Sequence, residues 1–149
     1  MVRLRQIRIY PIKSVPGIEL SAHSVVETGL LWDRHWMLTD GPGNFITQRE
    51  EPILNTLQVS QINNGFKIKP LNDDRNELIL PLVVAQNSGT KPVKIWGSEF
   101  QAIRTETDAS EWFSDFLHKK VELVQINPGA RMKRNSLWPM AFPLSFTDG

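Results

Sequence analysis

Lysine, serine and arginine residues near the start of the chain have the side chains best suited to bind an oxyanion. Lys13 and Ser14 occupy a short segment that ends in Pro16-Gly17, and these residue types predict a turn. Successive backbone amides of such a turn can converge on an anion, and ammonium and hydroxyl groups donate well to phosphate. No Gly-x-x-x-x-Gly-Lys occurs, so the segment is not a Walker loop. For either residue alone, a solvated surface position is the simpler interpretation.

Arg34 is a second candidate, because the pattern around it predicts a charge on an apolar strand face. Residues 29–50 predict two strands around a turn at residues 41–44. Strict alternation would put on one face Trp32, Arg34, Trp36 and Leu38. It would put on the other face Asp33, His35, Met37 and Thr39. A buried guanidinium needs an anionic partner, and the residues alone favour an internal carboxylate, such as Asp40 or Glu50, over an external anion.

The other cations fall into groups along the chain. One group precedes every acidic residue and comprises Arg3, Arg5, Arg8 and Lys13. Another follows the last predicted strand and comprises Arg131, Lys133 and Arg134. The net charge is only +1, which argues against a general nucleic-acid or membrane-surface binder, since such proteins carry a strong basic excess.

The absence of cysteine restricts metal and redox chemistry. With 149 residues and no cysteine, neither a disulfide framework nor a thiolate zinc site can form. The histidines, His23, His35 and His118, lie far apart without ligand spacing, and no Ser/His/Asp arrangement can be argued. No signal-peptide core or membrane-spanning stretch is present. We therefore expect a cytoplasmic protein with no membrane and no nucleic-acid partner.

Alternation and turn residues predict many short strands. They lie at residues 6–12, 18–26, 53–62, 66–69, 78–84, 93–96, 100–105 and 121–126. Asn64-Gly65 predicts a type I′ hairpin turn, which requires two residues with positive φ.

One helix is predicted at residues 108–118. Asp108 with Glu111 resembles a capping box, and apolar side chains at helical spacing form one stripe that comprises Trp112, Phe113, Phe116 and Leu117. The pattern predicts a mainly β fold, a small β-barrel of short antiparallel strands with this single helix.

The last residues follow a different pattern. Residues 138–149 are apolar without periodicity, and two prolines exclude a helix. Either this tail packs on the barrel, or it leads into a further domain, which we favour because exposed apolar ends reduce solubility. We therefore divide the chain into a domain at residues 1–126 and a loop with an apolar tail at residues 127–149.

Several motifs occur in a characteristic order over nearly the whole chain. They are Tyr10-Pro11-Ile12-Lys13-Ser14, Asp33-Arg34-His35-Trp36-Met37, Phe45-Ile46-Thr47-Gln48-Arg49-Glu50, Val93-Lys94-Ile95-Trp96, the segment 108–117 and Phe146-Thr147-Asp148-Gly149. In this combination the chain resembles the N-terminal β-barrel region of MOSC proteins (molybdenum cofactor sulfurase C-terminal). This group contains the amidoxime- and N-hydroxylamine-reducing molybdoenzymes.

The resemblance implies that the chain helps to hold the molybdopterin cofactor. In such proteins the Lys-Ser pair after the first strand and the Arg of the Asp-Arg-x-Trp strand contact the cofactor, and these positions match Lys13, Ser14 and Arg34. The cofactor's phosphate is a dianion, which suits positive charge in a partly dry cleft. At family level, pyridoxal phosphate binding is also implied. No catalytic residue and no metal ligand are expected in this chain.

The family's metal-ligating cysteine lies in the MOSC domain proper, which would follow Gly149. We therefore expect this chain alone to be inactive and to hold no molybdenum in a reactive state. Its expected partners are a MOSC domain and an electron-donor protein, and the joined protein is expected to reduce N-hydroxylated substrates. Two non-catalytic alternatives stay open. One is a barrel that captures single-stranded nucleic acid, and the other is a scaffold that binds a partner protein through the apolar tail.

Overall fold

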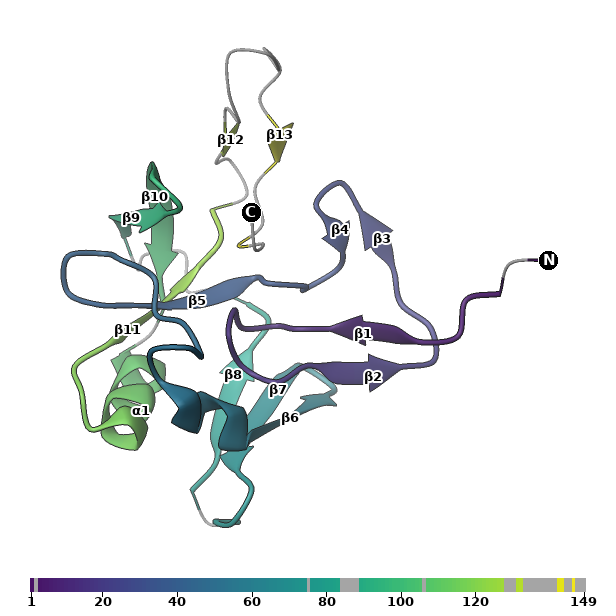
Figure 1. Cartoon of the computed structure of the whole chain (residues 1–149), viewed down its shortest axis with the longest axis horizontal. Coiled ribbons are helices and arrows are strands. Elements are labelled where there is room, and N and C mark those ends of the chain that lie inside the picture. The colour runs from purple at the N-terminus through teal and green to yellow at the C-terminus, as the bar shows by residue number, and fades with distance from the viewer. Residues whose placement is uncertain are drawn as a thin grey trace.

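Short antiparallel strands are the main secondary structure of the described chain (Figure 1). The computed structural model describes residues 1, 3–74, 76–83, 89–105, 107–127, 131–132, 142–143 and 146. The elements are β1 (Ile7–Ile9), β2 (Ile18–Leu20), β3 (Val25–Val26), β4 (Gly29–Leu30), β5 (Trp36–Thr39), the 3-10 helix η1 (Pro52–Thr56), β6 (Leu57–Ile62), β7 (Gly65–Pro70), β8 (Leu78–Pro81), β9 (Thr90–Ile95), β10 (Ser98–Arg104), α1 (Thr107–Leu117), β11 (Glu122–Gln125), β12 (Arg131–Met132) and β13 (Phe142–Pro143). The predicted mainly β class with one α-helix is confirmed.

The described strands are grouped into several antiparallel sheets. The largest has the order β5-β11-β10-β9, and a second has the order β6-β7-β8. The pairs β1-β2, β3-β4 and β12-β13 complete the set. Isolated bridges pair Ile12 with Trp36, Thr39 with Phe45 and Asn44 with Lys94. The strand pairings of the described residues do not close one sheet into a barrel.

Strand β5 lies between two apolar cores. Trp36 and Leu38 belong to the larger core, whereas Met37 belongs to a smaller one with Val93 and Phe146. All four residues of β5 are buried, so this strand shows no apolar–polar alternation at the sequence level. Phe146 is the one residue of the predicted apolar tail with a described side chain, and it is fully buried in the smaller core. Most of the predicted tail lies outside the described residues.

The prediction of a strand running from Trp32 to Leu38 is wrong at its beginning. Trp32 and Arg34 have φ values of +65° and +48°, in the left-handed region that an extended strand excludes. The chain turns here, with the Asp33 amide donating to the Leu30 carbonyl at 3.0 Å, and β5 starts only at Trp36. Trp32 nevertheless packs on the larger core and stacks on Trp36 with ring centroids 5.9 Å apart.

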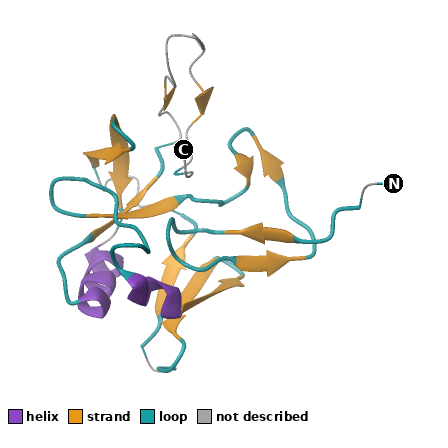
Figure 2. Ribbon diagram, viewed as in Figure 1, coloured by secondary structure: helices purple, strands orange, loops and turns teal. Residues whose placement is uncertain are grey.

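Helix α1 buries the predicted apolar stripe. Phe113 and Leu117 are in the core, and Trp112 and Phe116 pack against it. The helix begins at Thr107, so Asp108 lies in its first turn instead of capping it. Helices α1 and η1 lie on the same side of the molecule (Figure 2), where Lys119 pairs with Glu51 at 2.8 Å. In the described part of the chain, no helix has the length and apolar character needed to cross a bilayer.

The strand predicted after the turn at residues 41–44 does not form, since only isolated bridges involve Asn44 and Phe45. Other predicted strands and one predicted turn also need correction. Residues 53–56 belong to η1, which begins at Pro52, and residues 21–24 separate β2 from β3. The β6–β7 hairpin forms, but Ile62 pairs with Gly65, so its turn is Asn63–Asn64. Gly65 is the first residue of β7. Glycine is needed there because a Cβ would collide with the Leu80 carbonyl oxygen of β8. A type I′ turn requires positive φ at both of its central residues. Trp96 and Gly97, between β9 and β10, meet this requirement.

Candidate anion-binding site

The segment after β1 runs parallel to the segment that enters β5. Ile12 and Trp36 form a parallel bridge. The Trp36 amide donates to the Pro11 carbonyl at 3.0 Å, and the Lys13 amide donates to the Trp36 carbonyl at 2.8 Å. This pairing brings the Lys13–Ser14 turn beside Arg34, although the two are distant in sequence.

Arg34 is held in place by its neighbours on both segments. Its guanidinium pairs with the Asp33 carboxylate and lies over the Tyr10 ring, with Cζ 4.7 Å from the ring centroid. The same carboxylate accepts the Tyr10 amide at 2.8 Å. The Arg34 side chain is 28% exposed, so the guanidinium is held by these neighbours and still reaches solvent.

The carboxylate partner of Arg34 is therefore internal, but neither Asp40 nor Glu50 provides it. Asp40 accepts both the backbone amide of Asn44, at 2.7 Å, and its side-chain amide, at 2.9 Å. Glu50 accepts the amide and hydroxyl of Thr47, each at 3.0 Å. Both carboxylates stabilise the turns in which they lie, since Asp and Glu readily bond to nearby backbone amides.

Ser14 lies at the corner of a tight turn. The Val15 amide donates to the Ile12 carbonyl at 3.2 Å, and Ser14 has φ +66° while Lys13 does not have positive φ. Positive φ at the third residue alone defines a type II turn, where glycine is the usual residue. A serine in this conformation costs about 1 kcal/mol. Ser14 and Arg34, two of the three predicted site residues, thus have left-handed backbone conformations.

Gly17 lies where the turn comes close to β1. It does not have positive φ, but a Cβ at this position would lie 2.6 Å from the Ile9 carbonyl oxygen and 2.9 Å from the Tyr10 ring. Glycine is therefore needed for close approach of the turn to β1, and not for its dihedral angles.

Lys13 is almost completely buried, with 1% of its surface exposed. Its Nζ lies 5.4 Å from the Phe45 ring centroid and 6.0 Å from that of Trp96. Aromatic faces stabilise a cation that has left water. The ammonium therefore acts on the site mainly through its field, because its surface is not open to solvent in this structure.

These residues line one cleft of about 590 Å³. The lining residues are Arg8, Tyr10, Lys13, Ser14, Val15, Pro16, Gly17, Arg34, Thr47, Gln48, Arg49 and Asn55. The structure thus brings all three predicted site residues together. Arg49 also lines the cleft, although it was not among the predicted site residues. The signal for it was the segment 45–50, one of the motifs, which contains Gln48-Arg49. Of the second cationic group, Lys133 and Arg134 lie outside the described residues, and only the backbone of Arg131 is described.

Residues 1–120 match the family model for the MOSC N-terminal beta barrel domain. The chain belongs to this family. The match contains the whole cleft, from Arg8 to Asn55.

Curated relatives match this chain over only part of their own length. Molybdenum cofactor sulfurase of Oryza sativa is 26% identical over 83% of this chain, but that match covers 15% of the sulfurase. Mitochondrial amidoxime-reducing component 1 of Mus musculus is 29% identical over 85% of this chain and 38% of its own. The chain therefore spans well under half the length of these relatives.

A solved structure supports the fold. The solution structure of a protein from Bordetella bronchiseptica superposes with a TM-score of 0.55 at 15% identity. The superposition covers 77% of this chain and 92% of that one. At this identity the likeness concerns the fold alone.

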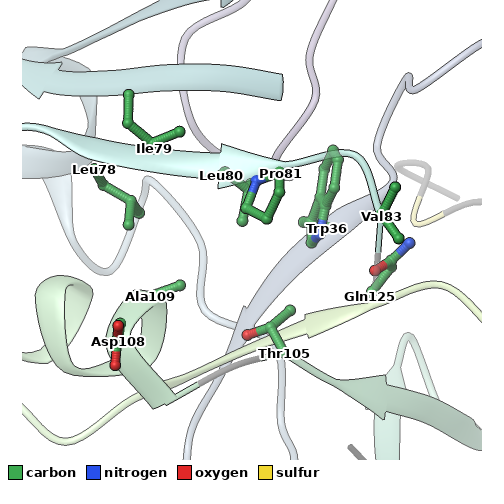
Figure 3. A pocket seen from close by; sticks show the side chains of 10 residues that line it. All are labelled: Trp36, Leu78, Ile79, Leu80, Pro81, Val83, Thr105, Asp108, Ala109 and Gln125. Carbon is green, nitrogen blue, oxygen red and sulfur yellow. The ribbon is translucent and has the colours of Figure 1, made fainter. Parts of the chain in front are cut away.

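A second pocket in this MOSC N-terminal domain is small and largely apolar. Side chains from β5, β8, β11 and the start of α1 converge on it, with Trp36 and Gln125 on one side (Figure 3). Its volume is about 90 Å³. Pockets for drug-sized ligands are several times larger, at roughly 300–1,000 Å³, so it is too small for a cofactor.

His35 lies beside this pocket and stays neutral at physiological pH. Burial lowers the pKa of His35 to about 4. Its Nε2 lies 2.5 Å from the Gln125 side-chain nitrogen, which can only donate, so the ring nitrogen accepts. His35 also makes edge-on contacts with the Trp32 and Trp36 rings. These contacts explain His35 as a structural residue.

The described tryptophans offer little surface for base stacking. Trp36 is buried, and Trp32 and Trp112 pack against the core, which leaves Trp96 with 58% exposure. Trp138 lies outside the described residues. Among the described residues, no cluster of three or more His, Cys, Asp or Glu side chains could hold a metal ion.

Proposed function

We propose that this chain is the N-terminal module of a molybdenum-cofactor enzyme and that its cleft holds the phosphate of molybdopterin. The observation that supports this most directly is the assembly of Lys13, Ser14 and Arg34 in one cleft. No carboxylate is among the lining residues, although Asp33 and Glu19 pair with cleft arginines from outside. Such a site attracts a dianion and rejects cations.

The donors in the cleft suit a phosphate. The Arg34 guanidinium has its orientation set by Asp33 and Tyr10, and its remaining N–H groups are directed away from them. The Ser14 hydroxyl and amide supply neutral donors at the corner of the turn. The buried Lys13 ammonium adds positive charge behind this corner, where water screens it little.

A complete redox centre would need a partner domain. Bound molybdenum would supply the redox chemistry, whereas this chain has no cysteine to ligate the metal. We propose that a MOSC domain provides the metal-binding half and that the joined protein, with an electron-donor protein, reduces N-hydroxylated substrates. The names of the amidoxime-reducing relatives support this choice of substrate.

The test measures cofactor occupancy in a protein that joins this chain to a MOSC domain. We expect the double variant Lys13→Met, Arg34→Ala to lower both bound molybdenum and bound pterin by about tenfold. Lys13→Met preserves the buried stem, which protects the fold. The matched control, Lys67→Met with Lys94→Ala, removes two cations from surface ion pairs outside the cleft and should leave occupancy unchanged. Equal occupancy in the cleft variant and the wild type would contradict the proposal.

A further inference from the structure

The cleft has cations beyond those at the proposed phosphate position. Four of its lining residues are cations, namely Arg8, Lys13, Arg34 and Arg49. Its volume of about 590 Å³ lies within the range of pockets that hold whole cofactors or drug-sized ligands. The proposed phosphate position at Ser14 and Arg34 uses donors from the segments around β1 and β5 and none from the segment 47–55.

The four cations differ in how far they are already neutralised. Arg34 pairs with Asp33, and Arg8 lies 3.6 Å from Glu19. Lys13 is buried against aromatic rings. Arg49 is exposed and, within the described residues, has no carboxylate partner.

Two glutamates follow Arg49 directly in the sequence, and both bind other groups. The Glu50 carboxylate is taken by the amide and hydroxyl of Thr47. The Glu51 carboxylate pairs with Lys119 at 2.8 Å. Both neighbouring carboxylates thus bind other groups, and neither neutralises the Arg49 guanidinium that lines the cleft.

We propose that the cleft is a two-point anion site in which Arg49 binds a second anionic group. This rests on the proposed function for the identity of the first group, the phosphate at Ser14 and Arg34. A ligand with two linked phosphoryl groups satisfies both ends, so the site takes a diphosphate in preference to a monophosphate. A guanidinium suits this task because its planar fork binds two phosphate oxygens at once.

The test compares inorganic orthophosphate with inorganic pyrophosphate on the purified chain by calorimetric titration at low ionic strength. We expect the wild type to bind pyrophosphate at least about tenfold more tightly than orthophosphate. Arg49→Gln should weaken pyrophosphate binding by about tenfold while changing orthophosphate binding less than about twofold. Arg49→Lys, which retains the charge without the fork, should recover only part of the loss.

Lys94→Gln is the matched control, because it removes one exposed cation outside the cleft. It should change the affinity for either anion less than about twofold, which would exclude an effect of net charge alone. The inference is wrong if the wild type shows no preference, or if Arg49→Gln weakens both anions equally or no more than Lys94→Gln does. In those cases the occupancy experiment on Lys13 and Arg34 still decides the proposed function. Conversely, the Lys13→Met, Arg34→Ala variant could keep full cofactor occupancy while the wild type still prefers pyrophosphate. That result would remove the molybdopterin assignment and leave the two-point site.

Discussion

The Arg34 guanidinium lies 4.7 Å from the Tyr10 ring centroid, while the Arg34 amide donates to the Tyr10 carbonyl at 2.7 Å. The backbones of the two residues are thus joined by a hydrogen bond, and their side chains are in contact. Asp33 completes the arrangement, since its carboxylate binds both the Tyr10 amide and the Arg34 guanidinium. The three residues join the end of β1 to the start of β5 and set the position of a cation in the cleft.

Asp33→Ala should therefore destabilise the protein. It leaves the partly buried Tyr10 amide without its acceptor and removes the partner of Arg34, and we expect a loss of about 1–3 kcal/mol in the free energy of unfolding. Urea denaturation measures this. Glu19→Ala breaks an exposed ion pair with Arg8 and should stay within about 0.5 kcal/mol of the wild type. Similar small losses in both variants would show that Asp33 does not organise this region.

Gly17→Ala should displace β1 from the turn that carries Ser14. The added Cβ would lie 2.6 Å from the Ile9 carbonyl oxygen, which is backbone and cannot move aside by itself. We expect destabilisation of about 1–3 kcal/mol, measured by thermal or urea unfolding. Gly41→Ala is the matched control, because Gly41 also lies in a turn but a Cβ there meets nothing within 4 Å. Equal stability of the two variants would contradict the close approach.

Lys91→Met should be costly despite the similar length of the side chain. Lys91 is 3% exposed, and its ammonium lies 3.1 Å from Glu122 and donates to the Asp40 carbonyl at 3.2 Å. The variant removes the buried ammonium from both acceptors, although Glu122 keeps its pair with Arg104 at 2.7 Å and the Asp40 carbonyl still accepts the Gly43 amide at 3.1 Å. We expect a loss of about 1–2 kcal/mol by urea denaturation. Lys94→Met, on the same strand but exposed and 3.9 Å from Glu99, should change stability by less than about 0.5 kcal/mol. A loss at Lys94 as large as at Lys91 would show that burial is not the cause.

His35 should make stability depend on pH below neutrality. Its pKa is about 4 in the folded protein, against an ordinary value of 6.5, so between these values the unfolded chain binds more protons. The free energy of unfolding should therefore fall as pH drops from 7 towards 4, by at most about 3 kcal/mol.

Urea midpoints at pH 7 and pH 5 measure this effect. His35→Gln should show a flatter pH dependence, whereas His118→Asn, which changes an exposed histidine after α1, should retain the wild-type dependence. An unchanged pH dependence in His35→Gln would assign the effect to other groups.

The sequence pattern predicted an element correctly where the spacing of its own residues determines its structure. The stripe of Trp112, Phe113, Phe116 and Leu117 predicted α1, because helical periodicity alone places these side chains on one face. The β6–β7 hairpin was predicted in place, but its turn shifted by one residue, because β8 requires glycine at position 65. Alternation failed at Trp32 and Arg34, since a left-handed backbone conformation leaves no trace in the spacing of apolar residues.

The sequence by itself predicted the mainly β class and the helix, and it suggested three site residues, which the structure brings into one cleft. Two of these three residues have left-handed backbone conformations. Only the tertiary structure decided which carboxylate pairs with which cation. Glu50 and Glu51 are adjacent to Arg49 in sequence, yet one binds Thr47 and the other Lys119, while Asp33 takes Arg34. The physical reason is that ion pairs depend on which groups the packed strands and turns bring within reach, and the parallel pairing of residues 10–13 with residues 34–36 is a long-range contact.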